Sequence, residues 1–210
     1  MFQSTSLSGR IWKRLPLSQI NSILLKEEVS NRSQFLMKFN PSIVQTRVPS
    51  PLGTIAIAAT DKGLAGLWFT ENQRHLPLGL TGPAAWPEDA GHPVLQQASQ
   101  QLGDYFAGRR SQFELPLDLR CGTAFQQSVW QALLAIPQGE VTSYGEVSRR
   151  IGKPSAVRAV GGAIGRNPIS IIVPCHRVTG SSGALTGYAG GLARKTALLR
   201  LEGALAESLS

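Results

Sequence analysis

After residue 42 the chain alternates short apolar runs with turn residues. Three apolar runs, 43–48, 54–59 and 64–69, each have the length of a strand. Residues 51–53 (Pro-Leu-Gly) and 61–63 (Asp-Lys-Gly) lie between the runs and have the composition of tight turns, the second of them typical of a hairpin. The pattern therefore predicts three consecutive strands.

The remainder of the first half predicts one helix. Apolar residues recur at helical spacing within 93–107, and Gly108 follows as a stop. They are Leu95, Ala98, Leu102, Tyr105 and Phe106. Residues 73–91 are rich in Pro and Gly and predict a loop, while 113–117 predict a short closing strand. Residues 42–118 together predict a small α+β unit.

The second half predicts short helices instead. Residues 123–134 carry apolar side chains at helical spacing. Ser143 and Glu146 then fit the capping-box pattern Ser-x-x-Glu, in which hydroxyl and carboxylate satisfy backbone donors at the start of a helix. A helix is therefore expected from 144 to about 151. A second short helix after a tight turn would complete a helix-turn-helix motif, although such hairpins are also common in proteins that do not bind DNA.

This second helix is unusually poor in large side chains. Residues 152–154 (Gly-Lys-Pro) break the chain, and Ser155 is expected to cap a helix that ends near Ile164. Small residues cover much of its surface, namely Ala156, Ala159, Gly161, Gly162 and Ala163. Each Gly costs about 1 kcal/mol relative to Ala in a helix, so something must compensate. Close packing in a core and a close approach to the roughly 6 Å wide minor groove of DNA both favour small residues. Arg158 favours DNA because it projects a long cation from this surface.

Charge and composition are compatible with DNA binding but do not establish it. The net charge of +8 favours phosphate backbones through counterion release, yet many basic proteins bind no nucleic acid. No apolar run approaches the roughly 20 residues that cross a bilayer, so no membrane partner is expected. Two cysteines, Cys121 and Cys175, cannot build a disulfide framework, and the three histidines stand too far apart in sequence to suggest a zinc site. We expect a reduced, reactive thiol and no metal.

Residues 1–41 differ from the rest of the chain. They are rich in Ser, Asn, Lys and Arg and have no sustained period. Their apolar content is too low for a secretory signal, and Glu27 and Glu28 argue against an organelle transit peptide. We expect either a disordered extension or a chain whose natural start is Met37.

Candidate chemistry centres on Cys175, which follows the apolar, strand-like run 169–173. The thiolate is the reactive form of cysteine, and a neighbouring base raises its population. His176 is the next residue, but adjacent side chains on an extended chain point to opposite faces, so a water bridge or a bend is needed to join them. By itself, the dipeptide is weak evidence, because it is more often a buried cysteine beside an incidental histidine.

Several short blocks together carry a family resemblance. They are Ser143–Glu146, Ala156–Ala163, Asn167-Pro168, Pro174–Val178, Gly187–Gly191 and Leu198–Gly203. In this order they resemble the C-terminal domain of the O6-alkylguanine-DNA alkyltransferases. The resemblance implies an α+β protein with a ribonuclease H-like α/β domain over 42–118, where the likeness is loose. A mostly helical domain with a helix-turn-helix would follow over 119–210, and residues 1–41 would be an extension.

The resemblance also implies a partner and a reaction. The partner is double-stranded DNA that carries O6-alkylguanine, and O4-alkylthymine is a second expected substrate. The motif would bind the minor groove through Ser155, Ala156, Ala159, Gly161 and Gly162. Arg158 would fill the gap left by the flipped base. Cys175 would then accept the alkyl group, with His176 and Glu202 polarising it through water.

Further roles follow from the same resemblance. Tyr144 would bind the guanine and protonate its N3, and Asn167 would act as a hinge. Carbonyls of Cys175 and Val178 would accept from the exocyclic amine, and the amide of Ala189, after Tyr188, would donate to the guanine oxygen. Because some relatives have Ser where this chain has Ala189, an altered substrate range is expected.

The same resemblance implies a single-use protein. A thioether has no easy hydrolytic exit, so each chain would act once and need no cofactor. Some members of the family hold a zinc ion. This sequence lacks a plausible set of ligands for it. We expect a monomer in a bacterial cytoplasm.

Three alternative functions are also considered, each of a different class from alkyl transfer. A lesion-binding relative without chemistry would lack the thiol of Cys175. A methylation-sensing regulator needs an additional metal-binding domain, for which residues 1–41, without cysteine, leave no room. A cysteine hydrolase would use Cys175 and His176 in repeated turnover.

Overall fold

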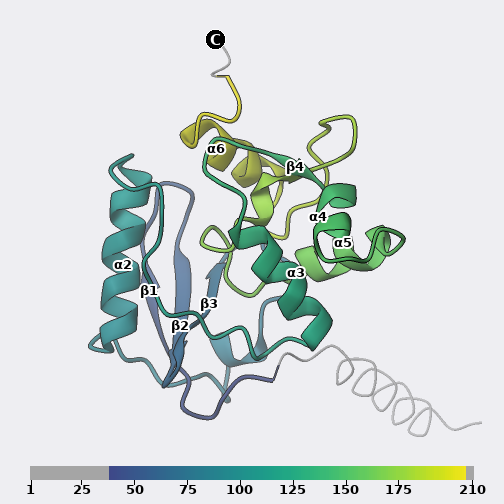
Figure 1. Cartoon of the computed structure of the whole chain (residues 1–210). Helices are drawn as coiled ribbons and strands as arrows, with labels where there is room; N and C mark the ends of the chain where they lie inside the picture. Colours follow the sequence, from purple (N-terminus) through teal and green to yellow (C-terminus); the bar gives the residue numbers. More distant parts are fainter. Residues whose placement is uncertain (1–37, 207–210) are drawn as a thin grey trace, which may run out of the picture. The chain divides into compact units, whose positions relative to one another are not determined.

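The computed structural model describes residues 38–206, and its first region contains an antiparallel sheet in the order β1-β2-β3 (Figure 1). The strands are β1 (Val44–Val48), β2 (Ile55–Thr60) and β3 (Gly63–Phe69). Ile57 pairs with Thr46 on one side and with Leu67 on the other. The three predicted strands are confirmed, each with ends within one residue of the expected bounds.

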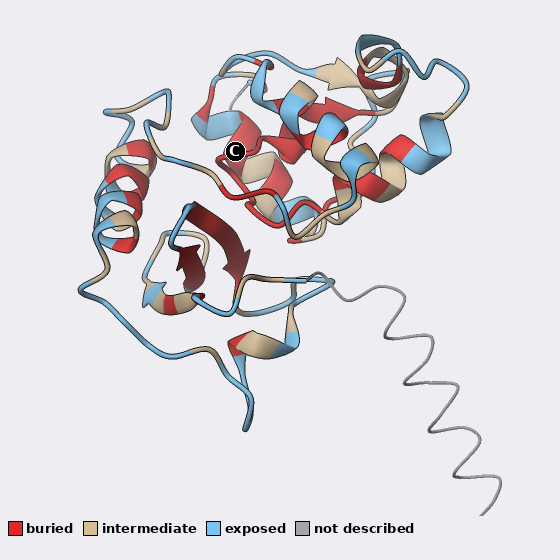
Figure 2. Ribbon diagram, turned by 60° about the horizontal axis from the view of Figure 1, so that its bottom comes forward, coloured by how far each residue is buried: buried red, intermediate tan, exposed pale blue. Residues whose placement is uncertain are grey.

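Strands β2 and β3 are apolar on both faces because both faces are covered (Figure 2). One face packs against helix α2 (Pro93–Phe106), which buries Leu95, Ala98, Leu102 and Tyr105. The opposite face forms a smaller cluster around Trp68, Trp86 and Leu80. The predicted helix is therefore confirmed, and the sheet forms the middle layer of the first region.

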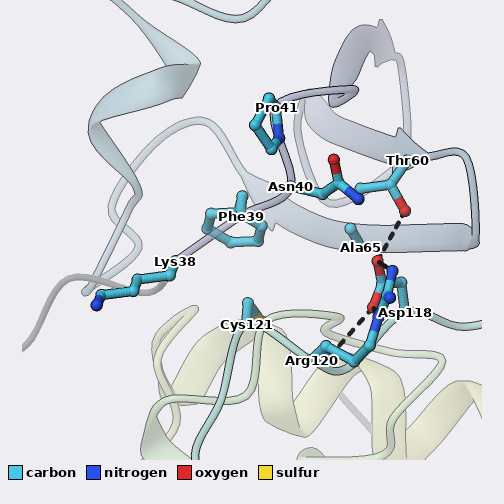
Figure 3. A pocket seen from close by; sticks show the side chains of 9 residues that line it. All are labelled: Lys38, Phe39, Asn40, Pro41, Thr60, Ala65, Asp118, Arg120 and Cys121. Atoms are coloured by element: carbon cyan, nitrogen blue, oxygen red, sulfur yellow. Dashed lines mark hydrogen bonds and ion pairs between the residues drawn. The ribbon is translucent and has the colours of Figure 1, made fainter.

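Residues 38–41 belong to this first region rather than to the extension expected for 1–41. The ring of Phe39 packs edge-on against Trp86, with 4.9 Å between centroids, and against Trp68, with 5.9 Å (Figure 3). Asn40 hydrogen-bonds to Asp61 in the turn between β2 and β3. The predictions for residues 1–37, including a start at Met37, concern residues outside the described part of the chain.

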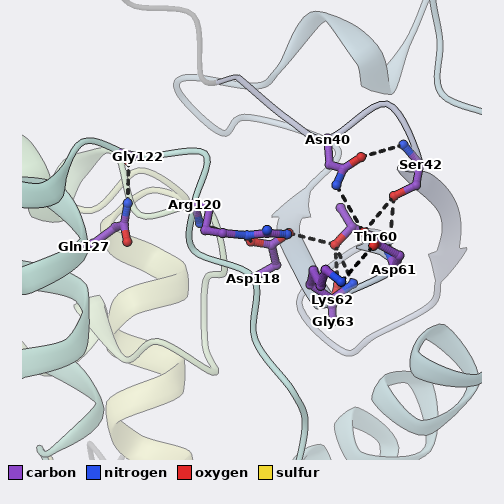
Figure 4. A network of polar contacts seen from close by, with 10 residues as sticks. All are labelled: Asn40, Ser42, Thr60, Asp61, Lys62, Gly63, Asp118, Arg120, Gly122 and Gln127. Atoms are coloured by element: carbon purple, nitrogen blue, oxygen red, sulfur yellow. Dashed lines mark hydrogen bonds and ion pairs between the residues drawn. The ribbon is translucent and has the colours of Figure 1, made fainter.

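The predicted closing strand at 113–117 does not form. A single bridge pairs Leu64 with Leu117, and the amide of Leu64 donates to the carbonyl of Pro116. Pro116 has no amide hydrogen, so it cannot donate to a ladder. Side chains take over the connection, since Asp118 accepts from Thr60 at 2.7 Å and from Arg120 at 2.8 Å (Figure 4).

The second region consists of short helices joined by a two-stranded parallel sheet. Its elements are α3 (Ala124–Leu134), β4 (Thr142–Ser143), α4 (Tyr144–Arg150), α5 (Val157–Gly165), η3 (Cys175–Arg177), β5 (Val178–Thr179) and α6 (Leu192–Leu201). Helices α4 and α5 contact each other and α3. Gly152 has a φ of +69° and turns the chain between α4 and α5. The predicted pair of short helices joined by a tight turn is confirmed.

Two predicted caps are wrong in detail. The Ser143 hydroxyl accepts from the amide of Glu146, but the Glu146 carboxylate pairs with Arg149 and Arg150 instead of returning to the backbone. The complete capping box lies at the start of α3, between Thr123 and Gln126. Ser155 does not cap α5 either, because the helix starts one residue later than expected, after Ala156, and no side chain caps it.

The apolar run 169–173 also differs from the strand-like segment that its composition suggested. Ile169 forms one bridge with Leu67 of β3, after which Ile171 adopts a φ of +70° and the chain curls towards η3. The amide of Leu67 donates to Pro168, and the amide of Ser170 donates to Leu67. Strand β3 thus holds the start of the segment that leads to Cys175.

Candidate thiol site

Cys175 opens the 3-10 turn η3 and is 4% exposed. Its side chain lines a pocket of about 110 Å³ together with Tyr144, Tyr188 and Ala189, three residues predicted for the substrate site. The structure therefore brings this part of the predicted site together. Because 110 Å³ is small compared with the roughly 300–1,000 Å³ of common ligand pockets, the thiol lies at the end of a narrow recess.

Asn167 contacts the sulfur directly, which the sequence did not reveal. Its amide nitrogen donates to Cys175 Sγ at 3.0 Å and to the carbonyl of Val173 at 2.7 Å, and its oxygen accepts from the amide of Ile169 at 3.0 Å. The residue follows the end of α5, so it joins that helix to the thiol segment. This is the place expected for the hinge.

Burial raises the pKa of the Cys175 thiol to about 11, while the Asn167 hydrogen bond and the charge of Lys195 act in the opposite direction. Desolvation disfavours the charged thiolate, whereas donors and cations favour it. Since the thiol is protonated at neutral pH, its chemistry requires a base nearby.

His176 lies in a buried ion network. Its Nε2 is 2.9 Å from Glu202 Oε1, and the same carboxylate accepts from Arg177 Nε at 2.8 Å and Nη2 at 2.9 Å. The hydrogen bonds from Arg177 and His176 outweigh burial and hold the pKa of Glu202 down at about 2, so the group is a carboxylate. Burial lowers the pKa of His176, which keeps the imidazole neutral.

The carboxylate fixes the tautomer of His176. A carboxylate only accepts hydrogen bonds, so the imidazole proton is on Nε2 and the lone pair is on Nδ1. Nδ1 is buried and has no hydrogen-bond partner among the described residues. The imidazole therefore has a free acceptor in the residue adjacent to the thiol, and the chain bends at this point because Cys175 and His176 both belong to the η3 turn.

Lys195 is a residue that sequence reasoning missed. Its side chain is fully buried, and its ammonium donates to the carbonyls of Val178, Thr186 and Gly187. Burial lowers its pKa to about 8. The spacing to Leu198, Leu199 and Glu202 places Lys195 on the inward face of α6, and that was an available signal.

Tyr144 and residues 187–189 line the pocket together with Cys175. The Tyr144 hydroxyl donates to the carbonyl of Thr186 at 3.1 Å, and the carbonyl of Ala189 accepts from the amide of Arg74 at 2.9 Å. The carbonyl of Val178, expected to bind substrate, already accepts from Lys195, so one of its two lone pairs is occupied.

The first region contributes to the pocket as well. Arg74 and His75, from the loop after β3, line it beside Cys175. His75 has a φ of +59°, which is uncommon for a residue with a side chain. Nothing in the pattern of residues 73–91 distinguished these two positions from an ordinary loop.

The small residues of α5 serve two purposes. Ala163 is buried in the core beside Val160 and Ile164. Gly161 faces the Tyr144 ring, and a Cβ added at Gly161 would lie 3.8 Å from that ring. Ser155, Arg158 and Ala159 are exposed, Ala156 and Gly162 are half-buried, and the carbonyl of Gly162 accepts from Arg166. Some of the small residues are therefore used in the core, while others lie on the exposed face.

Cys121 lies in a separate pocket of about 290 Å³ (Figure 3). Burial is the main cause that raises its pKa, to about 12, and the nearby charge of Asp118 acts in the same direction. Asp118 and Arg120, which line the same pocket, are bonded to each other. Between residues 38 and 206 no group of three or more His, Cys, Asp or Glu is placed to hold a metal, and no helix there is long and apolar enough to cross a membrane.

A helix-turn-helix that is linked through Asn167 to a buried thiol, with an acceptor nitrogen in the residue after the thiol, is the arrangement expected of a DNA-binding protein with cysteine chemistry. Two family models match the chain. The 6-O-methylguanine DNA methyltransferase ribonuclease-like domain matches residues 43–119, and the DNA binding domain of the same name matches residues 124–204. The chain belongs to the 6-O-methylguanine DNA methyltransferase family.

Individual relatives agree with this assignment. The methylated-DNA--protein-cysteine methyltransferase of Mycobacterium tuberculosis H37Rv is 51% identical over 155 residues, which cover 74% of this chain and 89% of the relative. The protein of that name from Methanosarcina barkeri is 48% identical over 74% of this chain and 94% of its own length. The crystal structure of Mycobacterium tuberculosis OGT in complex with DNA superposes with a TM-score of 0.68 at 49% identity, over 76% of this chain and 92% of the other.

Proposed function

We propose that the protein repairs DNA by transferring the alkyl group of O6-alkylguanine irreversibly to Cys175. The observation that carries this proposal is the surroundings of the sulfur. Cys175 Sγ accepts from Asn167 at 3.0 Å, and the adjacent His176 binds Glu202 through Nε2 and keeps a buried Nδ1 with no partner among residues 38–206. A nucleophile beside an oriented base is the arrangement that activates a thiol.

The reaction begins with removal of the thiol proton. His176 Nδ1 accepts it, directly or through water, while Glu202 stabilises the imidazolium that forms. The thiolate attacks the alkyl carbon, so a sulfur–carbon bond forms as the carbon–oxygen bond to guanine breaks. Asn167 donates to the sulfur and favours the thiolate during this step.

Tyr144 assists the departure of guanine. The base enters beside the Tyr144 hydroxyl, which exchanges its hydrogen bond to Thr186 for one to ring N3 and gives up its proton there. Neutral guanine leaves, the imidazolium of His176 releases the thiol proton to solvent, and the Tyr144 phenolate takes up a proton from solvent. The amide of Ala189 donates to the guanine oxygen, and the carbonyls of Cys175 and Val178 accept from the exocyclic amine.

Duplex DNA reaches this pocket through α5. Its exposed face carries Arg158 and Ala159, Ser155 lies exposed just before the helix, and small residues allow the helix to approach the minor groove closely. Arg158 fills the space of the flipped base, which enters past Gly161 towards Tyr144. Mycobacterium tuberculosis OGT, a relative of similar fold, has been crystallised in complex with DNA, which supports the same partner here.

The product explains the stoichiometry of the reaction. A thioether is stable in water, so each chain accepts one alkyl group and no cofactor takes part. We propose O4-alkylthymine as a second substrate, a monomer as the active form and a bacterial cytoplasm as its location, in keeping with the named mycobacterial relatives.

The proposed function is tested by counting how many methyl groups each chain accepts. Protein is incubated with excess duplex DNA that carries labelled O6-methylguanine, and label bound to protein is counted over time. We expect a rise to one equivalent of label per chain and then a plateau. Label released to water over many cycles would indicate a hydrolase, and DNA binding without any transfer would indicate a lesion-binding relative without chemistry.

A further inference from the structure

The carboxylate that orients His176 is also held from the first region of the molecule. Tyr105 lies near the end of α2 and is 1% exposed. Its hydroxyl donates to Glu202 Oε1 at 2.7 Å, across 97 positions of sequence. A helix that covers the sheet therefore contacts the acid-base network of the thiol site.

Three donors share one carboxylate oxygen. Glu202 Oε1 accepts from the Tyr105 hydroxyl, from His176 Nε2 and from Arg177 Nη2. Each donor draws on the same negative charge, so a hydrogen bond from Tyr105 weakens the one that Glu202 makes with His176. A carboxylate with fewer donors would hold the imidazolium form of His176 more strongly.

The phenol is well placed to act as a fixed donor. Its ring packs against Phe106, with 5.3 Å between centroids, and against Phe113, with 5.4 Å. Burial and the charge of Glu202 raise the pKa of Tyr105, so the hydroxyl keeps its proton throughout the accessible pH range. The donor is thus permanent as well as rigid.

We propose that Tyr105 is a positioning residue for alkyl transfer, which acts through Glu202 to set how readily His176 accepts the thiol proton. The inference rests on the proposed function, since it assigns a role within that reaction. It also gives the first region a part in the chemistry beyond forming one wall of the pocket.

Other charged and titratable groups surround the same network. Arg177 belongs to η3 as His176 does, Tyr188 precedes α6, and Lys195 projects from α6 beside Cys175. All of them remain unchanged when only the Tyr105 hydroxyl is removed. A shift in the behaviour of His176 after that change is therefore attributable to the lost donor.

The test compares Tyr105→Phe with the wild-type protein. Single-turnover transfer of the methyl group from duplex O6-methylguanine is measured from about pH 5 to pH 9 with the full chain. Without the hydroxyl, more of the carboxylate charge acts on His176, and the imidazole becomes protonated at higher pH. We expect the acid limb of the rate profile to move up by about one pH unit, which is a tenfold loss of rate at the low end.

Gln101→Leu is the matched control. Gln101 lies on the same helix one turn earlier, is also buried, and its side chain bonds to the backbone of Glu114 instead of to Glu202. This variant weakens the attachment of α2 without touching the network. We expect its profile to have the acid limb of the wild-type protein.

A second substitution covers the case in which Tyr105→Phe does not fold. Site-specific 3-fluorotyrosine at position 105 keeps the hydroxyl but makes it a stronger donor, so the acid limb should move to lower pH. Nitrogen chemical shifts of the His176 ring should follow the same order. Superimposed profiles for wild type, the phenylalanine variant and the fluorinated variant would overturn the proposal, as would an equal shift in Gln101→Leu. If the wild-type protein itself transfers no methyl group, the proposed function falls and this inference with it.

Discussion

The two cysteines of this chain differ in burial and, more sharply, in their neighbours, since Cys175 is buried and Cys121 is half-buried. Burial raises both thiol pKa values, to about 12 for Cys121 and about 11 for Cys175. The charge of Asp118 raises the first further, and that carboxylate is already bonded to Arg120. Cys175 instead receives a hydrogen bond from Asn167 and precedes a neutral imidazole with an open nitrogen. Neighbouring donors and acceptors, more than burial, distinguish a reactive thiol from an inert one.

The largest effect is expected when each of the two thiols is removed in turn. Cys175→Ala should abolish methyl transfer and retain binding to duplex DNA, because the helix-turn-helix is unchanged. Cys121→Ala should transfer one equivalent at the wild-type rate. Both are measured by single-turnover transfer and by a DNA mobility shift. Residual transfer in Cys175→Ala would place the acceptor elsewhere.

Glu202→Gln tests the partners of the imidazole. The change removes the charge that stabilises the imidazolium and should lower the rate of transfer by about 10²–10⁴, the range of general acid-base catalysis. It also leaves Arg177 buried without its counter-charge, which should lower the free energy of unfolding by about 3–5 kcal/mol. Denaturant unfolding and single-turnover kinetics measure the two effects. Glu71→Gln, an exposed site away from the network, is the control and should change neither.

The same ion pair predicts how stability depends on acid. The pKa of Glu202 is lowered from 4.5 to about 2 in the folded protein, so its contribution is complete above the unfolded value and lost as pH falls through the folded one. We expect the free energy of unfolding to decrease by on the order of 3 kcal/mol between about pH 4.5 and pH 2 from this group. Denaturant titrations at several pH values check the slope, and a wild-type slope in Glu202→Gln would contradict the assignment.

Arg158→Ala tests how the damaged base leaves the duplex to reach Cys175. If the side chain replaces a flipped base, its loss should slow repair of duplex DNA by roughly tenfold to a hundredfold, since base extrusion costs a few kcal/mol. Repair of a single-stranded or free-base substrate should be nearly unchanged. An equal loss on both kinds of substrate would show that Arg158 does not act in extrusion.

Asn167→Ala gives a smaller and more specific effect. The amide hydrogen bond lowers the pKa of the Cys175 thiol, so its removal should raise that pKa and reduce transfer by about tenfold at neutral pH. Asn40→Ala, in which a half-buried asparagine far along the chain loses its hydrogen bond to Asp61, is the matched control and should transfer normally. A wild-type pH profile in Asn167→Ala would mean that the bond to sulfur has no role in ionisation.

Periodicity was sufficient for most of the fold, since the three strands, the helix before Gly108 and the paired short helices all occur as expected. It failed where the backbone depends on distant partners. Residues 113–117 do not form a strand, and the carbonyl of Pro116 accepts a hydrogen bond from the amide of Leu64. Ile171 has a positive φ, which turns the run 169–173 out of an extended conformation. Composition alone carries neither constraint.

The site was predictable where residues are close in sequence or fall into recognised blocks. Cys175, His176, Tyr144 and Glu202 were expected from the resemblance and lie as neighbours or around one pocket and its ion network. Arg74, His75 and Tyr105 come from the first region, and only the fold brings the first two to the pocket of the thiol and Tyr105 to Glu202. Lys195 was hidden because a lysine on a helix is ordinarily read as exposed.

The central claim is tested most directly by locating the transferred group. Wild-type protein is allowed to react to completion with duplex DNA that carries O6-methylguanine, then digested and examined by peptide mass spectrometry. We predict one methyl group, on the peptide that contains Cys175, with the peptide of Cys121 unmodified. Methylation of Cys121, or of neither cysteine after the lesion has disappeared, would contradict the account.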